Sequence, residues 1–407
     1  MTMELYIYSP AALLGVVDGT TSIRWRRKYF EPGEIEIHLP ATAENLALCA
    51  IGHLVRRIGC DEAAIIEGHA VDGDDLTLTG RMLSWVLRRS IIAGTYTFTG
   101  STYETAMLAL IAEAARATPQ IVSGAAHGFP DALTTQVGWK NLLTVQTKLS
   151  RASNIGFKML FEPGIWTFQT YKGVDRSIGQ SANPFVFFSD EFGNLTSPKY
   201  NRDVSGMKNF AHVVGEATDA GQSVVQVDLT GGADRREMYV DASDVSSTTG
   251  MKNSFTGNGS TKAFALSRTP GQIKSVEING NSTSAYALTG STIAFTTAPA
   301  SGAMITVAFD YSMTAAEYAA VLRQKGMEAL AGYPESESFE ATGEDVGNFQ
   351  YRQDWDLGDI VTVQYMKLGI STNQRVTEVE EVYENGMATV TPTFGTPLPE
   401  VLDLEDD

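Results

Sequence analysis

Alternating residues between turns rich in aspartate and glycine constrain the C-terminal part of this chain more than any other feature. Residues 354–363 begin with the turn sequence DWDLGD and continue as a strand whose successive side chains would lie on opposite faces of a sheet. A second turn is expected at Gly369, and residues 375–383 form the next predicted strand. The pattern therefore predicts an antiparallel meander with one buried face and one wetter face.

The composition is typical of a folded protein with more than one domain. A chain of 407 residues is too long for one ordinary hydrophobic core. A content of 43% hydrophobic and 19% charged residues argues against a disordered protein. No apolar run is long enough to span a membrane, and the N-terminus lacks the pattern of a secretion signal. Cys49 and Cys60 do not form a redox or zinc motif, so we expect two reduced, buried thiols and synthesis in a reducing cytoplasm.

The formal net charge of −18 argues against a surface that grips nucleic-acid phosphates. An acidic wall is still compatible with a channel through which DNA passes, because it would repel the phosphates and prevent sticking. Many soluble proteins are simply acidic, so charge alone does not decide between these interpretations.

The N-terminal part of the chain is predicted to consist mostly of short strands, with a short helix at residues 81–92. The expected strands are residues 4–8, 22–29, 34–39, 54–57, 63–70 and 75–79. Residues 99–152 are more helical. A capping box at Ser101 and Glu104 predicts a helix over residues 104–117, and a second helix is expected over residues 141–152.

Strands are expected to resume after the second helix. They are residues 156–161, 165–171, 184–189, 195–201, 209–216 and 223–229. A further capping box, Thr314 with Glu317, predicts a helix that runs to about Ala331. The closing strands would lie between residues 336 and 393, followed by an acidic tail.

The segment from about Gly250 to Asp310 differs from the rest in composition. Between residues 251 and 309, four basic residues stand against Glu277 alone, a net charge of +3 in an otherwise acidic chain. The segment is rich in Ser, Thr, Gly and Ala and alternates as about five short strands. These are residues 263–266, 273–278, 285–288, 292–295 and 304–309. We interpret it as a domain inserted into a surface loop.

No group of residues in the sequence forms a recognisable catalytic or metal-binding motif. The histidines are His38, His53, His69, His127 and His212, and none stands at metal-ligand spacing from another. No nucleophile-elbow, zinc-protease or phosphate-loop motif occurs. We therefore predict no catalytic residue, no cofactor and no metal ion.

Two aspartate-rich turns allow a functional interpretation but favour a structural one. The aspartates of residues 71–75 fail the pattern of a calcium loop and are expected to form a solvated turn. Asp354, Asp356 and Asp359 could act as paired carboxylates in glycoside hydrolysis. Their place in a predicted hairpin turn favours a structural role.

Aromatic residues in two places raise the same question. Trp25, in the basic run of residues 24–28, could contact nucleic acid. A tryptophan on a strand is more often part of the core, and the basic residues would then pair with acidic neighbours or with another subunit. In the proposed insert, Tyr286, Phe295 and Phe309 could stack on sugar, but we expect them to be core aromatics.

The order of the C-terminal segments resembles that of a family of siphophage tail proteins, the Gp37-like tail-hub proteins. There, a turn and strand like residues 354–363 is followed by elements like residues 368–370, 375–381 and 391–395. The N-terminal and middle parts contain further matches in the family's order. These are residues 22–29, 32–40, 76–83, 88–89 and 187–195. The insert lies outside this pattern and resembles small β-sandwich modules of phage tail and fibre proteins.

The resemblance implies a mainly β fold with an α+β element. The expected parts are two tail-tube-like β-barrel hub domains, a small α/β domain and an inserted β-sandwich. Their predicted bounds are 1–98 for the first barrel, 99–175 for the α/β domain, 176–249 with 312–400 for the second barrel, 250–311 for the insert and 401–407 for the acidic tail.

The resemblance also implies a structural role in the virion, at the phage tail tip. Three copies would form a hub that joins the tail tube to the distal tip and lines the DNA channel, with DNA passing through without specific binding. Expected partners are the tail tube or distal tail protein, the tape-measure protein and a tip spike or receptor-binding protein. The insert could bind a host-surface glycan. The alternatives are a tail-associated cell-wall hydrolase or peptidase, or a carbohydrate-binding host-recognition protein.

Overall fold

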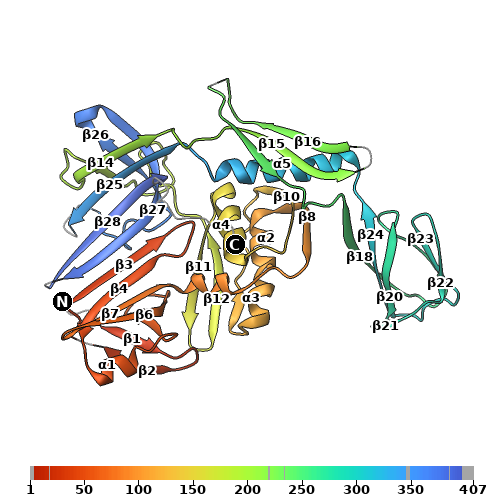
Figure 1. The fold of residues 1–407 in the computed structure, drawn as a ribbon, viewed down its shortest axis with the longest axis horizontal. Coiled ribbons are helices and arrows are strands. Elements are labelled where there is room, and N and C mark those ends of the chain that lie inside the picture. The colour runs from red at the N-terminus through yellow and green to blue at the C-terminus, as the bar shows by residue number, and fades with distance from the viewer. Residues whose placement is uncertain are drawn as a thin grey trace.

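The computed structural model describes residues 4–17, 19–218, 221–232, 234–344, 349–384 and 386–396. The molecule is elongated, with a large β-sheet at one end, helices in the middle and a small β module at the other end (Figure 1). The fold is mainly β, as predicted. None of the helices in the described part of the chain combines the length and the apolarity that a membrane crossing requires.

One 13-stranded sheet joins the N-terminal and C-terminal parts of the chain. The joining ladder is the antiparallel pairing of β3 (Ser22–Lys28) with β27 (Ile370–Glu384). From edge to edge the strands are β14 (Thr196–Asp203), β25 (Ser336–Glu344), β28 (Met387–Thr396), β27, β3, β4 (Glu34–Pro40), β7 (Asp75–Met82), β6 (Ala64–Asp72), β5 (Leu54–Arg57), β1 (Leu5–Tyr8) and β2 (Leu13–Val17). Beside this path, β13 (Phe187–Ser189) pairs with β26 (Ile360–Tyr365), which pairs with β27.

Two hydrophobic clusters pack on this sheet, one from each half of the chain. The N-terminal cluster contains Trp25 and Ile37, which are almost completely buried because strand alternation directs them to the same side of the sheet as their neighbours. The C-terminal cluster contains Phe339 and Phe394. The short helix α1 (Ala43–Leu48) lies at the edge of the N-terminal half and buries none of its own residues.

The central part is an α/β unit with its own core. Leu110 and Phe168 lie in this core, with neighbours from both helices and strands. Its elements are the 3₁₀ helix η1 (Leu83–Arg89), β8 (Thr95–Thr102), α2 (Tyr103–Ala109), α3 (Ile111–Ala117), β9 (Ile121–Ser123), β10 (Ala132–Gly138), α4 (Leu142–Ser153), β11 (Gly156–Glu162) and β12 (Ile165–Tyr171).

A three-stranded sheet and a long helix connect the central unit to the insert. The sheet has the order β16 (Gly221–Asp228), β15 (Phe210–Thr218) and β17 (Glu237–Asp241), and α5 (Ala315–Ala331) packs on one face of it. Gly326 makes this packing close, because a Cβ atom there would lie 2.6 Å from the side chains of Val213 and Val227. The predicted capping box of α5, Thr314 with Glu317, is confirmed.

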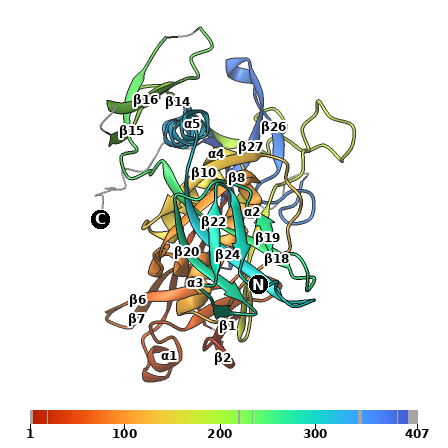
Figure 2. The same cartoon turned by 90° about the vertical axis from the view of Figure 1, so that its right-hand side faces the viewer.

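The insert is a module of two small sheets around its own core. One sheet is β18 (Thr248–Thr256), β24 (Met304–Ser312), β20 (Gln272–Ile278) and β21 (Asn281–Ser282); the other is β19 (Ala263–Ala265), β23 (Thr292–Phe295) and β22 (Tyr286–Thr289). The chain enters through β18 and leaves through β24, and these two strands pair along their whole length. Seen from the side of the insert, the module stands in front of the central unit (Figure 2).

Several predictions from the sequence need correction. No sheet of the described residues closes into a barrel, because the ladder between β3 and β27 merges the strands of both expected barrels into one open sheet. The predicted helix 104–117 is interrupted at Leu110 and is capped by Thr102, not Ser101. The side chain of Glu104 is turned inward instead of completing a capping box. Residues 83–89 form a 3₁₀ helix, shorter than predicted.

Candidate functional site

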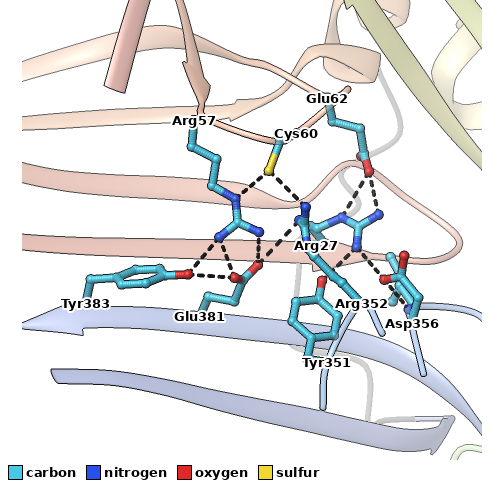
Figure 3. A network of polar contacts seen from close by, with 10 residues as sticks. Arg27, Arg57, Cys60, Glu62, Tyr351, Arg352, Asp356, Glu381 and Tyr383 are labelled. Carbon is cyan, nitrogen blue, oxygen red and sulfur yellow. Dashed lines mark hydrogen bonds and ion pairs between the residues drawn. The ribbon is translucent and has the colours of Figure 1, made fainter. Parts of the chain in front are cut away.

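A buried polar cluster lies where β3 and β5 face the C-terminal part of the chain (Figure 3). We call it the ionic junction. Its members are Arg27, Arg57, Cys60, Glu62, Tyr351, Arg352, Asp356, Glu381 and Tyr383. Arg27 follows Trp25 by two residues on β3, so the alternation of the strand buries both side chains. Residues from the two ends of the chain therefore meet inside the protein.

One half of the ionic junction is centred on Arg57. The guanidinium forms a bidentate ion pair with Glu381, and Nη2 lies 2.7 Å from Oε1. The same group donates to the hydroxyl of Tyr383 at 2.9 Å and to the sulfur of Cys60 at 2.6 Å. Burial alone would lower the pKa of Arg57, but the Glu381 carboxylate outweighs burial and raises the pKa. Arg57 is therefore charged and fully engaged.

The other half is centred on Arg27. The guanidinium Nε lies 3.0 Å from the carboxylate of Glu62, and Nη1 lies 2.8 Å from Asp356 and 2.7 Å from the hydroxyl of Tyr351. Partial burial alone would raise the pKa of Asp356, whose side chain is 49% exposed, but Arg27 and the backbone N–H of Leu357 outweigh burial and hold the pKa below its usual range. Asp356 is thus an ionised partner of Arg27 and has little capacity to act as a catalytic acid.

Arg352 links the two halves of the ionic junction. Nη1 donates to the sulfur of Cys60 at 2.9 Å, and Nη2 lies 3.6 Å from Glu381. Three guanidinium groups thus face three carboxylates, those of Glu62, Asp356 and Glu381, so the cluster is electrically balanced. Such balance is needed because an uncompensated buried charge is costly. The cluster is suited to fastening the two ends of the chain together.

The DWDLGD turn, residues 354–359, also holds the segment that follows β12, residues 173–176. Asp359 accepts a hydrogen bond from the backbone N–H of Val174 at 2.7 Å and from Arg176 Nε at 2.8 Å. Gly358 adopts a φ of +96°, which favours glycine. Gly173 lies against Gly358 so closely that a Cβ atom at Gly173 would be 2.0 Å from its carbonyl carbon. Asp354, the third aspartate considered for catalysis, accepts a hydrogen bond from the backbone N–H of Gln350 at 2.7 Å. All three aspartates of the turn therefore hold local or tertiary structure.

The basic run of residues 24–28 is paired with acidic side chains across the sheet. Arg24 pairs with Glu380, and Arg26 is 3.1 Å from Glu34. Together with the burial of Trp25, this confirms the structural interpretation of the run. A nucleic-acid contact through these residues was not expected, and their cations have carboxylate partners.

The other residues considered in the sequence lie apart from the ionic junction. Asp75 lies 2.7 Å from His38 Nδ1 and raises the pKa of that histidine. In the insert, Phe295 and Phe309 are buried, as expected for core aromatics, and Tyr286 packs against the same core while partly exposed. Within the described ranges, no group of three or more His, Cys, Asp or Glu residues is arranged to hold a metal ion.

Cys49 and Cys60 are both free and buried, as predicted. Burial raises the pKa of Cys49 to about 11. The contacts of Cys60 with two arginines were not predicted, because nothing in the local sequence distinguishes a thiol beside arginines from an ordinary core cysteine. Glu62, Tyr351 and Arg352 were missed for the same reason.

Glu104 is a second buried carboxylate that sequence reasoning misplaced. It accepts hydrogen bonds from the backbone N–H groups of His127, Gly128 and Phe129 at 2.7–3.0 Å, and from the Thr170 hydroxyl at 2.9 Å. Burial raises the pKa of Glu104, but these donors outweigh it and the pKa lies below its ordinary value. The carboxylate thus anchors the loop before β10 on β12.

The hydrogen bonds of Glu104 predict a contribution to stability that depends on pH. Because the folded-state pKa of Glu104 is lowered, its contribution to the free energy of unfolding is present above the unfolded pKa, near 4.3, and is lost as pH falls through the folded value. We expect Glu104→Gln to destabilise the protein by about 1–3 kcal/mol at pH 7. In urea unfolding, the difference from wild type should shrink below pH 4.5. Glu44→Gln, on the exposed face of α1, is the control; an equal loss there would contradict the anchor.

Comparisons with known proteins give a consistent result. Residues 4–396 match the family described as Siphovirus ReqiPepy6 Gp37-like protein. The chain belongs to this family. The Gp37-like chain also shares its fold with a tail protein from Neisseria meningitidis MC58, with 12% identity, a TM-score of 0.54 and coverage of 97% of this chain and 96% of the other.

A second solved structure resembles the Gp37-like chain in fold. Prophage tail protein gp18 from Listeria monocytogenes EGD-e has 10% identity and a TM-score of 0.50, with coverage of 96% of this chain and 94% of that chain. A comparison with curated proteins gave no match. Membership of the family identifies the protein as a phage tail protein and thus as a component of the virion.

Proposed function

We propose that this Gp37-like protein is the hub of the phage tail tip, the structural part that joins the tail tube to the distal tip. The observation that carries the proposal is the family match, which spans residues 4–396 and includes both halves of the 13-stranded sheet. A hub must transmit load between tube and tip, and the ionic junction fastens the N-terminal and C-terminal parts into one body. A structural role thus agrees with the ionic junction, whose ion pairs hold the N-terminal and C-terminal parts together.

The hub is a homotrimer in this proposal. Each chain contributes two β units with separate cores, one around Trp25 and one around Phe394, on one sheet. Three copies would therefore present six β units to a sixfold tube. The described strands form no closed barrel, but this does not affect the count, since each unit has its own core.

A central channel with an acidic wall is the second part of the proposal. The chain carries a net charge of −18 and residues 251–309 of the insert carry +3, so the rest of the chain carries −21. The basic run of residues 24–28 has carboxylate partners, which limits its capacity to bind phosphates. DNA would then pass without specific binding, because few basic contacts would form and release counterions.

Averaged electron cryomicroscopy images of tail tips would test the hub. We expect three copies of this chain around the axis and more carboxylates than basic side chains on the channel wall. A hexamer would contradict the argument from two β units in each chain, and a channel lined with lysine and arginine would contradict the electrostatic part.

We further propose that the chain is structural and not catalytic. Of the three carboxylates for which hydrolysis was considered, Asp356 and Asp359 are held by Arg27 and Arg176, and Asp354 accepts a hydrogen bond from the Gln350 backbone. Neighbours in the tip would be the tail tube or distal tail protein, the tape-measure protein and a spike or receptor-binding protein. The insert, which projects from the body in Figure 1, would face outward and take part in host attachment, with a surface glycan as its ligand.

The insert supplies a separate prediction. Its two connecting strands, β18 and β24, lie side by side, so removing residues 250–310 and joining the ends with a short Gly/Ser linker requires little loop closure. The remaining protein should fold with an unchanged unfolding midpoint, and any loss should affect attachment to cells. Circular dichroism during thermal unfolding and a cell-binding assay measure the two effects. A truncated protein that fails to fold would make the module part of the hub.

A further inference from the structure

Trp139 combines an unfavourable backbone conformation with an exposed side chain. It lies between β10 and α4, its φ is +53°, and it is 71% exposed. A bulky side chain crowds its own backbone in this left-handed region, where glycine and asparagine are the usual residues. The other non-glycine residues with a positive φ in the described ranges are two asparagines, Asn154 and Asn279, and Arg352 of the ionic junction. Tryptophan at this position therefore contributes less to folding than asparagine would.

Hydrogen bonds hold Trp139 in this conformation. Its N–H donates to the carbonyl of Ile92 at 2.8 Å, and the N–H of Ile92 donates to the carbonyl of Lys140 at 3.0 Å. Ile91 forms a bridge with Asn141, the N-cap residue of α4. The surrounding structure thus keeps the indole in solvent at the expense of backbone strain. Strain of this kind is concentrated at positions that bind or switch.

Apolar and basic side chains surround Trp139. Ile91 is 47% exposed. The guanidinium of Arg116 lies 3.3 Å from the carbonyl of Ile91, and this side chain is 56% exposed. Lys140 follows Trp139 in the sequence and is 61% exposed. Arg88, also exposed, is joined through its carbonyl to the side-chain amide of the α4 N-cap residue. We call these five residues the Trp139 patch.

The Trp139 patch is positively charged on its outer side. Asp244 lies 3.6 Å from Lys140 and is the exposed carboxylate beside it. Glu113 pairs with Arg116 at 3.0 Å, but its side chain is buried and also accepts hydrogen bonds from a backbone N–H and from the Tyr96 hydroxyl. Three exposed cations thus stand against one exposed carboxylate, in a chain of net charge −18. The patch therefore fits a ligand that is both apolar and acidic.

We propose that residues 397–407 of this chain bind the Trp139 patch. The segment follows β28, lies outside the described residues and has the sequence PLPEVLDLEDD. It carries five carboxylates and no basic residue, and its aliphatic side chains are Leu398, Val401, Leu402 and Leu404. The aliphatic side chains would cover the indole, and the carboxylates would pair with the basic side chains of the patch. Blocks of acidic residues often act as interaction segments. The proposal does not depend on the hub.

Photocrosslinking from the acidic segment identifies its contacts. The full-length protein carries a benzophenone amino acid in place of Leu402, and mass spectrometry locates the crosslinks after irradiation. We expect crosslinks to residues 88–93 and 139–141. Trp139→Asn should lower their yield by about tenfold or more, because a central tryptophan supplies much of the binding energy of such a contact. Asparagine suits a positive φ, so this variant should stay folded.

Ile165→Asn is the matched control for Trp139→Asn. Ile165 is an exposed apolar residue of β12, 50% exposed, and lies outside the Trp139 patch, so the crosslinks should be unchanged. Crosslinks confined to other parts of the chain would overturn the proposal. A yield that Trp139→Asn leaves at the wild-type level would do the same.

Acrylamide quenching of fluorescence measures how well Trp139 is covered. Trp25, Trp166 and Trp355 are buried, and the difference between wild type and Trp139→Phe isolates the signal of Trp139. Replacing the five carboxylates of residues 397–407 by amides should increase the quenching of Trp139 severalfold. Added NaCl at about 1 M should act in the same direction, because the Debye length falls to about 3 Å. Equal quenching of Trp139 in the wild type and in the amide variant would overturn the proposal.

A lysine substitution tests the charge of the patch. Lys140→Gln should increase the quenching of Trp139, whereas Lys367→Gln should not, since Lys367 is exposed on the 3₁₀ helix η2 (Met366–Leu368) outside the patch. Equal effects of the two variants would contradict a specific contact. The concentration of the protein then identifies the molecule that supplies the segment. Protection at every concentration supports binding within one chain, and protection that rises with concentration supports binding to a second copy.

Discussion

Replacing Glu381 with glutamine should lower the free energy of unfolding by about 3–5 kcal/mol, the usual cost of removing one partner from a buried ion pair. Glu381 neutralises Arg57 through a bidentate contact and faces Arg352 at 3.6 Å. The amide would leave the buried guanidinium of Arg57 and the partly exposed guanidinium of Arg352 without this charged partner. Urea unfolding followed by tryptophan fluorescence measures the effect, because the buried Trp25 and Trp355 lie beside Arg57 and Tyr351 of the ionic junction.

The adjacent residue is a natural control. Glu380 lies on the other face of β27 and pairs with Arg24, whose side chain is 51% exposed, so Glu380→Gln should cost no more than about 1 kcal/mol. The double variant Arg57→Met/Glu381→Leu should recover much of the stability lost by Glu381→Gln, because the buried charge of Arg57 is removed with its partner and only the partly exposed Arg352 loses its contact with Glu381. Equal losses from Glu380→Gln and Glu381→Gln would show that the ionic junction does not hold the two ends together.

The local parts of this fold were predictable from the sequence. Strand alternation located β3 and β5 and placed Trp25 in the core, and the pattern of Thr314 with Glu317 located the start of α5. These features depend on neighbours a few residues apart, which a periodic pattern encodes.

The ionic junction was not predictable, because its contacts join distant segments. Arg57 and Glu381 are 324 residues apart in sequence, and nothing in either local pattern specifies the other. The prediction of two closed barrels was wrong for a related reason. The pairing of β3 with β27 joins strands that are far apart in the sequence, and neither local pattern specifies it. The short strand β2 was missed because LLGVV has no alternation of polar and apolar residues.

Replacing Gly173 with alanine should destabilise the protein by about 3 kcal/mol, at the upper end of the usual cost of overpacking. The new Cβ would lie 2.0 Å from both the carbonyl carbon and the oxygen of Gly358, and 2.3 Å from the N atom of Asp359. Those are backbone atoms, so no side-chain rotation can relieve the contact. The DWDLGD turn must move instead, and the 2.7 Å hydrogen bond from Val174 N–H to Asp359 should weaken.

Hydrogen exchange at Val174 separates this local effect from a general loss of stability, because its amide should lose protection beyond the change in global unfolding. Gly179→Ala is the matched control: the nearest atom to its Cβ would be 4.0 Å away, so the change should be neutral or slightly stabilising. If the Val174 amide of Gly173→Ala kept its wild-type protection, residues 173–174 would not be in contact with the DWDLGD turn. The expected result would instead give a physical reason for Gly358 in the DWDLGD turn. This glycine allows residues 173–174, which are distant in sequence, to pass against the turn, and Asp359 then holds them there.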